Sequence, residues 1–168
     1  MKRFTLLTFV LVLGLALVCA GPVSAKMTLK LATVTPTKHA YNDGAREFAR
    51  LVNEGTKGEV EIKVYPGGQL GKGERELLEG MQMGIIDIAV TSTGPLSNFS
   101  PDMGVVDLPF LFLSNEHVDK VLDGPVGRKL LDDLEKANLK GLAFMENGFR
   151  NFTNSARPLE KPEDLKGL

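Results

Sequence analysis

The sequence predicts an α/β fold with a mostly parallel sheet and flanking helices. Segments in which apolar and polar residues alternate, the pattern of half-buried strands, are followed by segments whose apolar residues recur every three or four positions, the pattern of amphipathic helices. Turns that contain glycine or proline separate these segments. Strands that alternate with helices form βα units, and such units build parallel sheets.

The first βαβ unit is predicted between residues 27 and 64. A strand over residues 27–34 alternates well, and a proline in the turn at 35–37 ends it because proline cannot donate to a strand ladder. A helix over residues 39–53 carries one apolar stripe. A second strand at residues 60–64 alternates apolar and charged positions.

The chain continues with a predicted helix over residues 72–83. Residues 85–90 are apolar on both faces apart from Asp87, which is typical of a fully buried central strand. A polar loop is expected over residues 91–101. The apolar run at residues 110–112 is expected to pack in the core, because aromatic residues beside a sheet usually fill it.

The last part of the chain contains two predicted helical pieces, at residues 116–123 and 126–137. Short strands are expected at residues 139–145 and 147–154. A helix start is expected at residues 162–165, where a proline precedes two acidic residues.

Residues 1–25 are predicted to be a signal peptide. A basic start precedes an apolar run over residues 4–20, and small residues lead to Ala25, after which we expect cleavage. A membrane anchor is the alternative, but the run is shorter than the about 20 apolar residues that a spanning helix needs. Cys19 leaves a lipid anchor open as a lesser alternative, because Val18 stands where lipoprotein processing normally takes Gly, Ala or Ser.

The composition argues against several classes of function. The chain has 20 basic and 21 acidic residues and no basic stripe, so we expect no nucleic-acid partner. The single cysteine lies in the predicted signal peptide, which leaves the mature chain without a thiol for a disulfide, a zinc site or a nucleophile. The two histidines lie far apart without carboxylates at metal-ligand spacing. No metal, no cofactor and no catalytic residue is therefore assigned.

Polar residues follow the predicted strands at the positions where a ligand is expected. In open α/β sheets, ligands lie beyond the carboxyl ends of the strands. These ends are Thr33-Val34-Thr35, Thr91-Ser92-Thr93 and the Phe149-Arg150 region. The first two contain small hydroxylated residues that suit hydrogen bonding to a small polar ligand, and the third brings a guanidinium group.

Six segments together provide a more specific signal than any one of them. In chain order they are His39 to Arg50 (HAYNDGAREFAR), Tyr65 to Gly71 (YPGGQLG), Gly84 to Ala89 (GIIDIA), Asp107 to Phe112 (DLPFLF), Gly148 to Asn154 (GFRNFTN) and Pro162 to Leu168 (PEDLKGL). Taken in this order, they resemble the DctP family, the periplasmic binding proteins of tripartite ATP-independent periplasmic (TRAP) transporters. The resemblance runs along nearly the whole mature chain.

The resemblance implies a two-lobed, periplasmic binding protein-like α/β fold that closes on a small organic acid, usually a carboxylate. Such a protein is periplasmic, is not an enzyme, and delivers its ligand to the small and large membrane permease subunits of the transporter. Residues 26–150 would form the first lobe, and residues 151–168 the crossover and the start of the second. Family members are roughly twice as long, so the second lobe is expected to be mostly missing from this sequence.

The resemblance also implies ligand-binding residues. The GFRNFTN segment places a family arginine at Arg150, and the planar guanidinium fork suits a carboxylate because it donates two parallel bonds. A second family arginine is expected beyond Leu168. The other ligand-binding residues that we predict are Val34, Thr35, His39, Ser92, Thr93, Asn98 and Asn154.

Structural roles are open alternatives for several of these residues. His39 and Asn98 equally suit a helix cap or a turn. Ser92 and Thr93 equally suit hydrogen bonding within their loop. Asn154 suits a role in fixing the crossover.

Two other functions are open at this point. A secreted α/β hydrolase-type enzyme could use the same architecture, and a histidine within hydrogen-bond reach of Ser92 would favour it. A ligand-sensing domain that signals to a membrane receptor is the other alternative.

Overall fold

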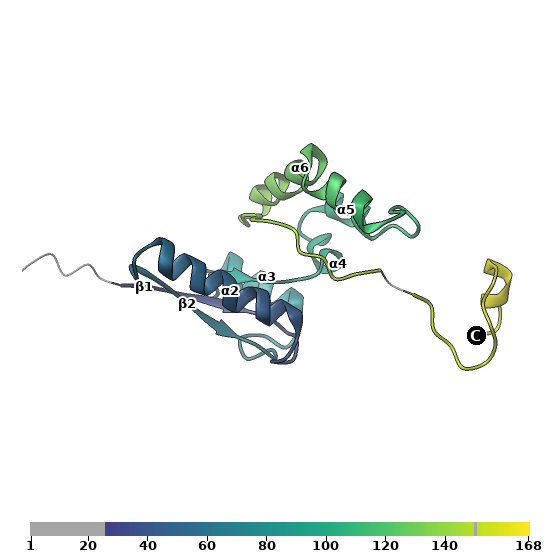
Figure 1. The fold of residues 1–168 in the computed structure, drawn as a ribbon, viewed down its shortest axis with the longest axis horizontal. Coiled ribbons are helices and arrows are strands. Elements are labelled where there is room, and N and C mark those ends of the chain that lie inside the picture. Colours follow the sequence, from purple (N-terminus) through teal and green to yellow (C-terminus); the bar gives the residue numbers. More distant parts are fainter. Residues whose placement is uncertain (1–25, 150) are drawn as a thin grey trace, which may run out of the picture. The chain divides into compact units, whose positions relative to one another are not determined.

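The computed structural model describes residues 26–149 and 151–168 (Figure 1). The described residues divide into two compact units, the first ending at Asn98 and the second beginning at Phe99. The predicted signal peptide, with Cys19 and the expected cleavage site at Ala25, lies outside the described residues, as does Arg150. The lobe boundary expected at residue 150 stays a prediction.

A three-stranded parallel sheet forms the centre of the first unit. Its strands are β1 (Met27–Ala32), β2 (Val60–Tyr65) and β3 (Ile88–Ala89), in the order β2-β1-β3. β1 pairs with β2 along its whole length and with β3 only at its last two residues, where Ala32 lies opposite Ala89. The predicted α/β class with a parallel sheet and flanking helices is thus confirmed.

Helices cover both faces of this sheet. α2 (Ala40–Gly55) lies over one face, as Figure 1 shows, and α3 (Glu74–Gln82) packs against the other. Successive residues of a strand point to opposite faces, so β1 contributes apolar side chains to both layers. The two buried clusters are Leu31, Ala45 and Ile62 on the α2 side and Ala32, Leu77 and Ile86 on the α3 side.

The prediction of a fully buried central strand at residues 85–90 is wrong. The central strand is β1, and β3 is a two-residue strand at the edge of the described sheet. Ile85 is 55 % exposed. Just before β3, the Asp87 carboxylate accepts a hydrogen bond from the Lys30 N–H at 2.7 Å, so a side chain takes the place of a backbone acceptor and shortens the ladder.

The residues predicted as a polar loop at 91–101 include a one-turn helix. This helix, α4 (Thr93–Leu96), follows β3 directly and belongs to the first unit. Ser92 occupies its N-cap position, although the Ser92 side chain makes no capping hydrogen bond.

The second unit is mainly helical, and the two helical pieces predicted there are present. Ser114 caps the first of them, because its hydroxyl accepts a hydrogen bond from the His117 N–H at 3.2 Å. The elements of the second unit are η1 (Pro101–Asp107), α5 (Asn115–Leu122), α6 (Pro125–Asp133), η2 (Leu134–Ala137) and η3 (Pro162–Leu165), where η denotes a 3₁₀ helix.

Two predictions for the second unit are wrong. The described residues within 139–154 form no strand, because they pair with no other segment in a ladder. Phe110 is 89 % exposed instead of packed in the core, and its backbone adopts a left-handed conformation with φ of 61°. Only Phe112 of that run is half-buried, with its ring edge-on to the His117 ring.

Candidate functional site

The carboxyl ends of β1 and β3 lie side by side in the first unit. The connection that follows β1 leads to β2 on one side of it, and the connection that follows β2 leads back to β3 on the other side of β1. The two connections therefore run in opposite directions across the sheet, and the strand order reverses between β1 and β3. Such a reversal is the topological switch point at which open α/β sheets bind ligands. The Val90 N–H donates to the Ala32 carbonyl at 3.1 Å, where the pairing stops. Residues 33–35 and 91–93, predicted from separate parts of the sequence, therefore leave adjacent strands.

Backbone N–H groups at these two strand ends have no protein acceptor. The amides of Val34 and Thr35 after β1, and of Thr91 and Ser92 after β3, donate to no group in the described part of the chain. All four residues are half-buried. Buried N–H groups are rarely left unpaired in folded proteins, so these donors are available to water or to an anionic ligand.

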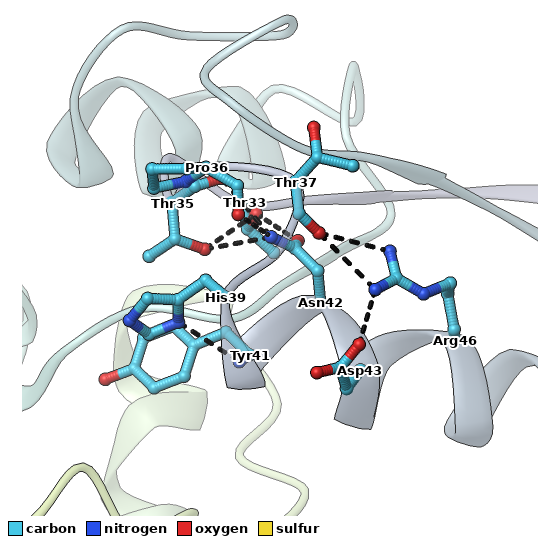
Figure 2. A network of polar contacts seen from close by, with 9 residues as sticks. All are labelled: Thr33, Thr35, Pro36, Thr37, His39, Tyr41, Asn42, Asp43 and Arg46. Carbon is cyan, nitrogen blue, oxygen red and sulfur yellow. Dashed lines mark hydrogen bonds and ion pairs between the residues drawn. The ribbon is translucent and has the colours of Figure 1, made fainter.

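Asn42 fixes the turn that follows β1. Its side chain is fully buried, and its Nδ2 donates to the Pro36 carbonyl at 2.8 Å and to Thr35 Oγ1 at 3.1 Å (Figure 2). Its Oδ1 accepts from Thr33 Oγ1 at 2.6 Å. Figure 2 shows these groups converging on one amide, which ties the turn to the start of α2.

The turn after β2 supports the same segment. The Gly67 N–H donates to the Thr35 carbonyl at 2.9 Å, and the Gly68 N–H donates to the Thr33 carbonyl at 3.0 Å. Both glycines have φ near +70°, at 67° and 72°, a left-handed conformation that glycine adopts without steric cost. Residues 66–73 therefore form a strand-to-helix turn between β2 and α3, and this turn is hydrogen-bonded to Thr33 and Thr35.

His39 caps α2 in this structure, which is one of the two roles left open by the sequence. Its Nδ1 accepts from the Tyr41 N–H at 3.2 Å, and the two rings meet edge-to-face at 4.8 Å. On the opposite side of the turn, Arg46 donates to the Thr37 carbonyl at 3.4 Å and to Asp43 at 2.5 Å. Figure 2 shows both sets of contacts.

Ser92 contacts a carboxylate that the sequence analysis did not single out. Its hydroxyl donates to Oε2 of Glu74, the first residue of α3. No histidine forms a hydrogen bond with Ser92 among the described residues, so the general base that a hydrolase would need is not seen beside it. Thr93, the next residue, begins α4.

Two further predicted residues, Asn98 and Asn154, form hydrogen bonds within local turns. Asn98 is exposed and donates to the Pro95 carbonyl at 3.1 Å, in the first unit. In the second unit, Asn154 donates to the Arg157 carbonyl at 2.9 Å and accepts from the Arg157 N–H at 3.0 Å. Arg150 lies outside the described residues.

Metal-binding and membrane-spanning features are absent from the part of the chain that the structure describes. No group of His, Cys, Asp and Glu side chains within residues 26–149 and 151–168 is arranged to hold a metal ion. No helix in those residues is long and apolar enough to cross a membrane.

Comparison with known proteins reveals related sequences. A family model described as "Bacterial extracellular solute-binding protein, family 7" (DctP) matches residues 31–168. The 2,3-diketo-L-gulonate-binding periplasmic protein YiaO of Escherichia coli is 37% identical over 155 residues, which are 92% of this chain and 47% of YiaO. The chain spans about half the length of the curated relatives it matches.

Solved structures show the same similarity. A TRAP periplasmic solute-binding protein from Polaromonas sp. JS666, bound to D-erythronate, superposes with a TM-score of 0.79 at 43% identity, covering 85% of this chain and 47% of that protein. A TRAP periplasmic solute-binding protein from Sulfurospirillum deleyianum, bound to succinate, superposes with a TM-score of 0.60 at 36% identity, covering 67% of this chain and 36% of that protein.

Proposed function

Because the chain belongs to the DctP family of bacterial extracellular solute-binding proteins, we propose that its full-length form captures a small organic acid and delivers it to a TRAP-type transporter. The site of capture is the periplasm, where the relative YiaO is named as a binding protein. The delivery partners are the small and large membrane permease subunits. The protein acts by binding and release, and it carries out no reaction on the ligand.

The observation that carries this proposal is the set of unpaired amides at the switch point. The N–H groups of Val34, Thr35, Thr91 and Ser92 have no acceptor among the described residues, and they follow neighbouring strands. A carboxylate accepts several such bonds, and bonds to an ionised acceptor are about twice as strong as neutral ones. A half-buried position strengthens them further, because the surrounding dielectric is lower than that of water.

The counter-charge comes from Arg150 in the GFRNFTN segment. A guanidinium group pairs with a carboxylate through two parallel hydrogen bonds, which fix the orientation of the ligand as well as its charge. Ser92 and Thr93 line the proposed ligand site on the side of β3. Asn98 and Asn154 contribute by holding the turns in which they lie.

Calorimetry on the full-length mature protein tests this function. We expect saturable binding of at least one acid from a panel that contains D-erythronate, 2,3-diketo-L-gulonate and succinate. Arg150→Ala should weaken that binding by about 1.5–3 kcal/mol, the typical contribution of a hydrogen bond to a charged group. Arg150→Lys should recover only part of the loss, because it keeps the charge without the planar fork.

An exposed arginine provides the matched control. Arg128 lies on α6 with an exposed side chain, and Arg128→Ala removes the same charge outside the proposed site. Its affinity should equal that of the unsubstituted protein. Failure of every carboxylate in the panel to bind would refute the proposed function, and unchanged affinity in Arg150→Ala would remove Arg150 from the site.

A further inference from the structure

Three hydroxyl groups at the two strand ends, those of Thr33, Thr35 and Ser92, already donate their hydrogens to protein acceptors. Asn42 turns its Nδ2 toward backbone carbonyls, so its Oδ1 faces Thr33 and receives the Thr33 hydroxyl hydrogen at 2.6 Å. Thr35 in turn donates to Thr33 Oγ1 at 3.3 Å. After β3, Ser92 donates its hydroxyl hydrogen to Glu74. What Thr35 and Ser92 still offer to a ligand is oxygen lone pairs.

Glu74 adds a strong acceptor beside Ser92. The residue is half-buried and begins a nine-residue helix, where the helix dipole favours a negative charge. Within the described residues, no lysine or arginine forms an ion pair with it. An ionised carboxylate accepts about four hydrogen bonds, and Ser92 supplies one of them. Glu74 therefore has acceptor capacity left.

The strand ends thus combine two complementary sets of groups. Backbone N–H groups donate, whereas the side chains of Thr35, Ser92 and Glu74 accept. A ligand that satisfies both sets needs an anionic acceptor group and, a short distance away, hydroxyl hydrogens to donate. A hydroxylated monocarboxylate has both. A dicarboxylate without hydroxyl groups, such as succinate, has no hydrogen to donate at neutral pH, and the second charge of any dicarboxylate would face Glu74 and be repelled.

We propose that Glu74 is a specificity-determining residue that selects hydroxylated monocarboxylates and disfavours dicarboxylates. This inference rests on the proposed function and concerns the same site. In the proposed site, ligand hydroxyls donate hydrogen bonds to the Glu74 carboxylate and to the hydroxyl oxygen of Ser92. The carboxylate of the ligand is held by the unpaired backbone amides.

The test compares acids with carbon chains of equal length on the full-length mature protein. D-Erythronate carries hydroxyls, butanoate carries none, and succinate carries a second carboxylate. By calorimetry, D-erythronate should bind more tightly than either of the other two. In Glu74→Gln, D-erythronate should bind about tenfold more weakly, because a charged acceptor is replaced by a neutral one. Succinate should bind more tightly than before, because the repulsion is gone.

Opposite changes for two ligands separate specificity from damage to the fold, since a misfolded variant loses both. Glu79→Gln is the matched control, because Glu79 lies on the same helix but pairs with Arg75; neither affinity should change. A preference for succinate in the unsubstituted protein, or an unaltered preference in Glu74→Gln, overturns this inference and leaves the proposed function standing. Absence of binding by every carboxylate overturns the proposed function itself.

Discussion

At the scale of single residues, Asn42 holds together the polar part of the first unit. Its buried amide forms hydrogen bonds with Thr33, Thr35 and the Pro36 carbonyl. Asn42→Leu keeps the same number and branching of side-chain heavy atoms but removes every one of these bonds. Each buried polar group left without a partner costs about 1–3 kcal/mol. We expect the free energy of unfolding to fall by at least about 2 kcal/mol, as measured by urea denaturation.

An exposed asparagine is the control for this substitution. Asn98 forms only an exposed turn contact, so Asn98→Leu should change the free energy of unfolding by no more than about 0.5 kcal/mol. Asn42→Asp should destabilise as well, because it directs a negative oxygen at the Pro36 carbonyl. If Asn42→Leu unfolds at the same urea concentration as the unsubstituted chain, the network does not stabilise the turn.

The sequence predicted where the polar residues of the site lie, but not what they donate or accept. The runs at 33–35 and 91–93 were recognisable because each follows an apolar strand pattern, and the structure places both at adjacent strand ends. The direction of each hydroxyl hydrogen depends on Asn42 and Glu74, which lie elsewhere in the chain. A signal for Asn42 was present, since it lies three residues before Ala45 on the buried side of the helix, where a polar residue needs a partner.

At the scale of elements, substitutions of His39 at the start of α2 can distinguish a capping role from a ligand-binding role. The Nδ1 atom of His39 accepts the Tyr41 N–H, one of the amides that a helix leaves unpaired at its start. Serine is a preferred cap, so His39→Ser should keep the stability of the chain, whereas His39→Ala should lose about 0.5–1 kcal/mol in thermal or urea unfolding. Ligand affinity of the full-length protein should be the same in both variants. A large loss of affinity in His39→Ser, at unchanged stability, would instead assign His39 to the ligand.

Elements were predictable where their partners are local. The helix predicted at 39–53 and the strand predicted at 60–64 match α2 and β2 closely, because the apolar stripe and the alternating strand pack against each other within one βαβ unit. The strands expected within 139–154 failed for the opposite reason. Alternation shows that a segment suits a sheet, but a strand also needs a neighbour with free backbone groups, and no described segment provides one.

At the scale of the whole molecule, the main feature is apolar surface in the second unit. Phe110 is 89 % exposed, Leu113 is 86 % exposed and Phe152 is 73 % exposed. Exposed apolar side chains in such numbers favour association, because their burial removes apolar area from water. The expectation of a core position for Phe110 failed because a run of apolar residues in the sequence does not show whether another segment packs against that run.

This surface leads to a prediction for residues 26–168 produced as a separate polypeptide. We expect association that increases with concentration in sedimentation-velocity experiments. The double substitution Phe110→Asn and Leu113→Ser should reduce it, because it removes two of the most exposed apolar side chains, and asparagine also suits the left-handed backbone at position 110. Lys120→Ser, an exposed polar position on α5, should leave association unchanged. A monomer at all concentrations that melts in one cooperative transition would show that these side chains are tolerated in water, and the surface would then need no covering segment.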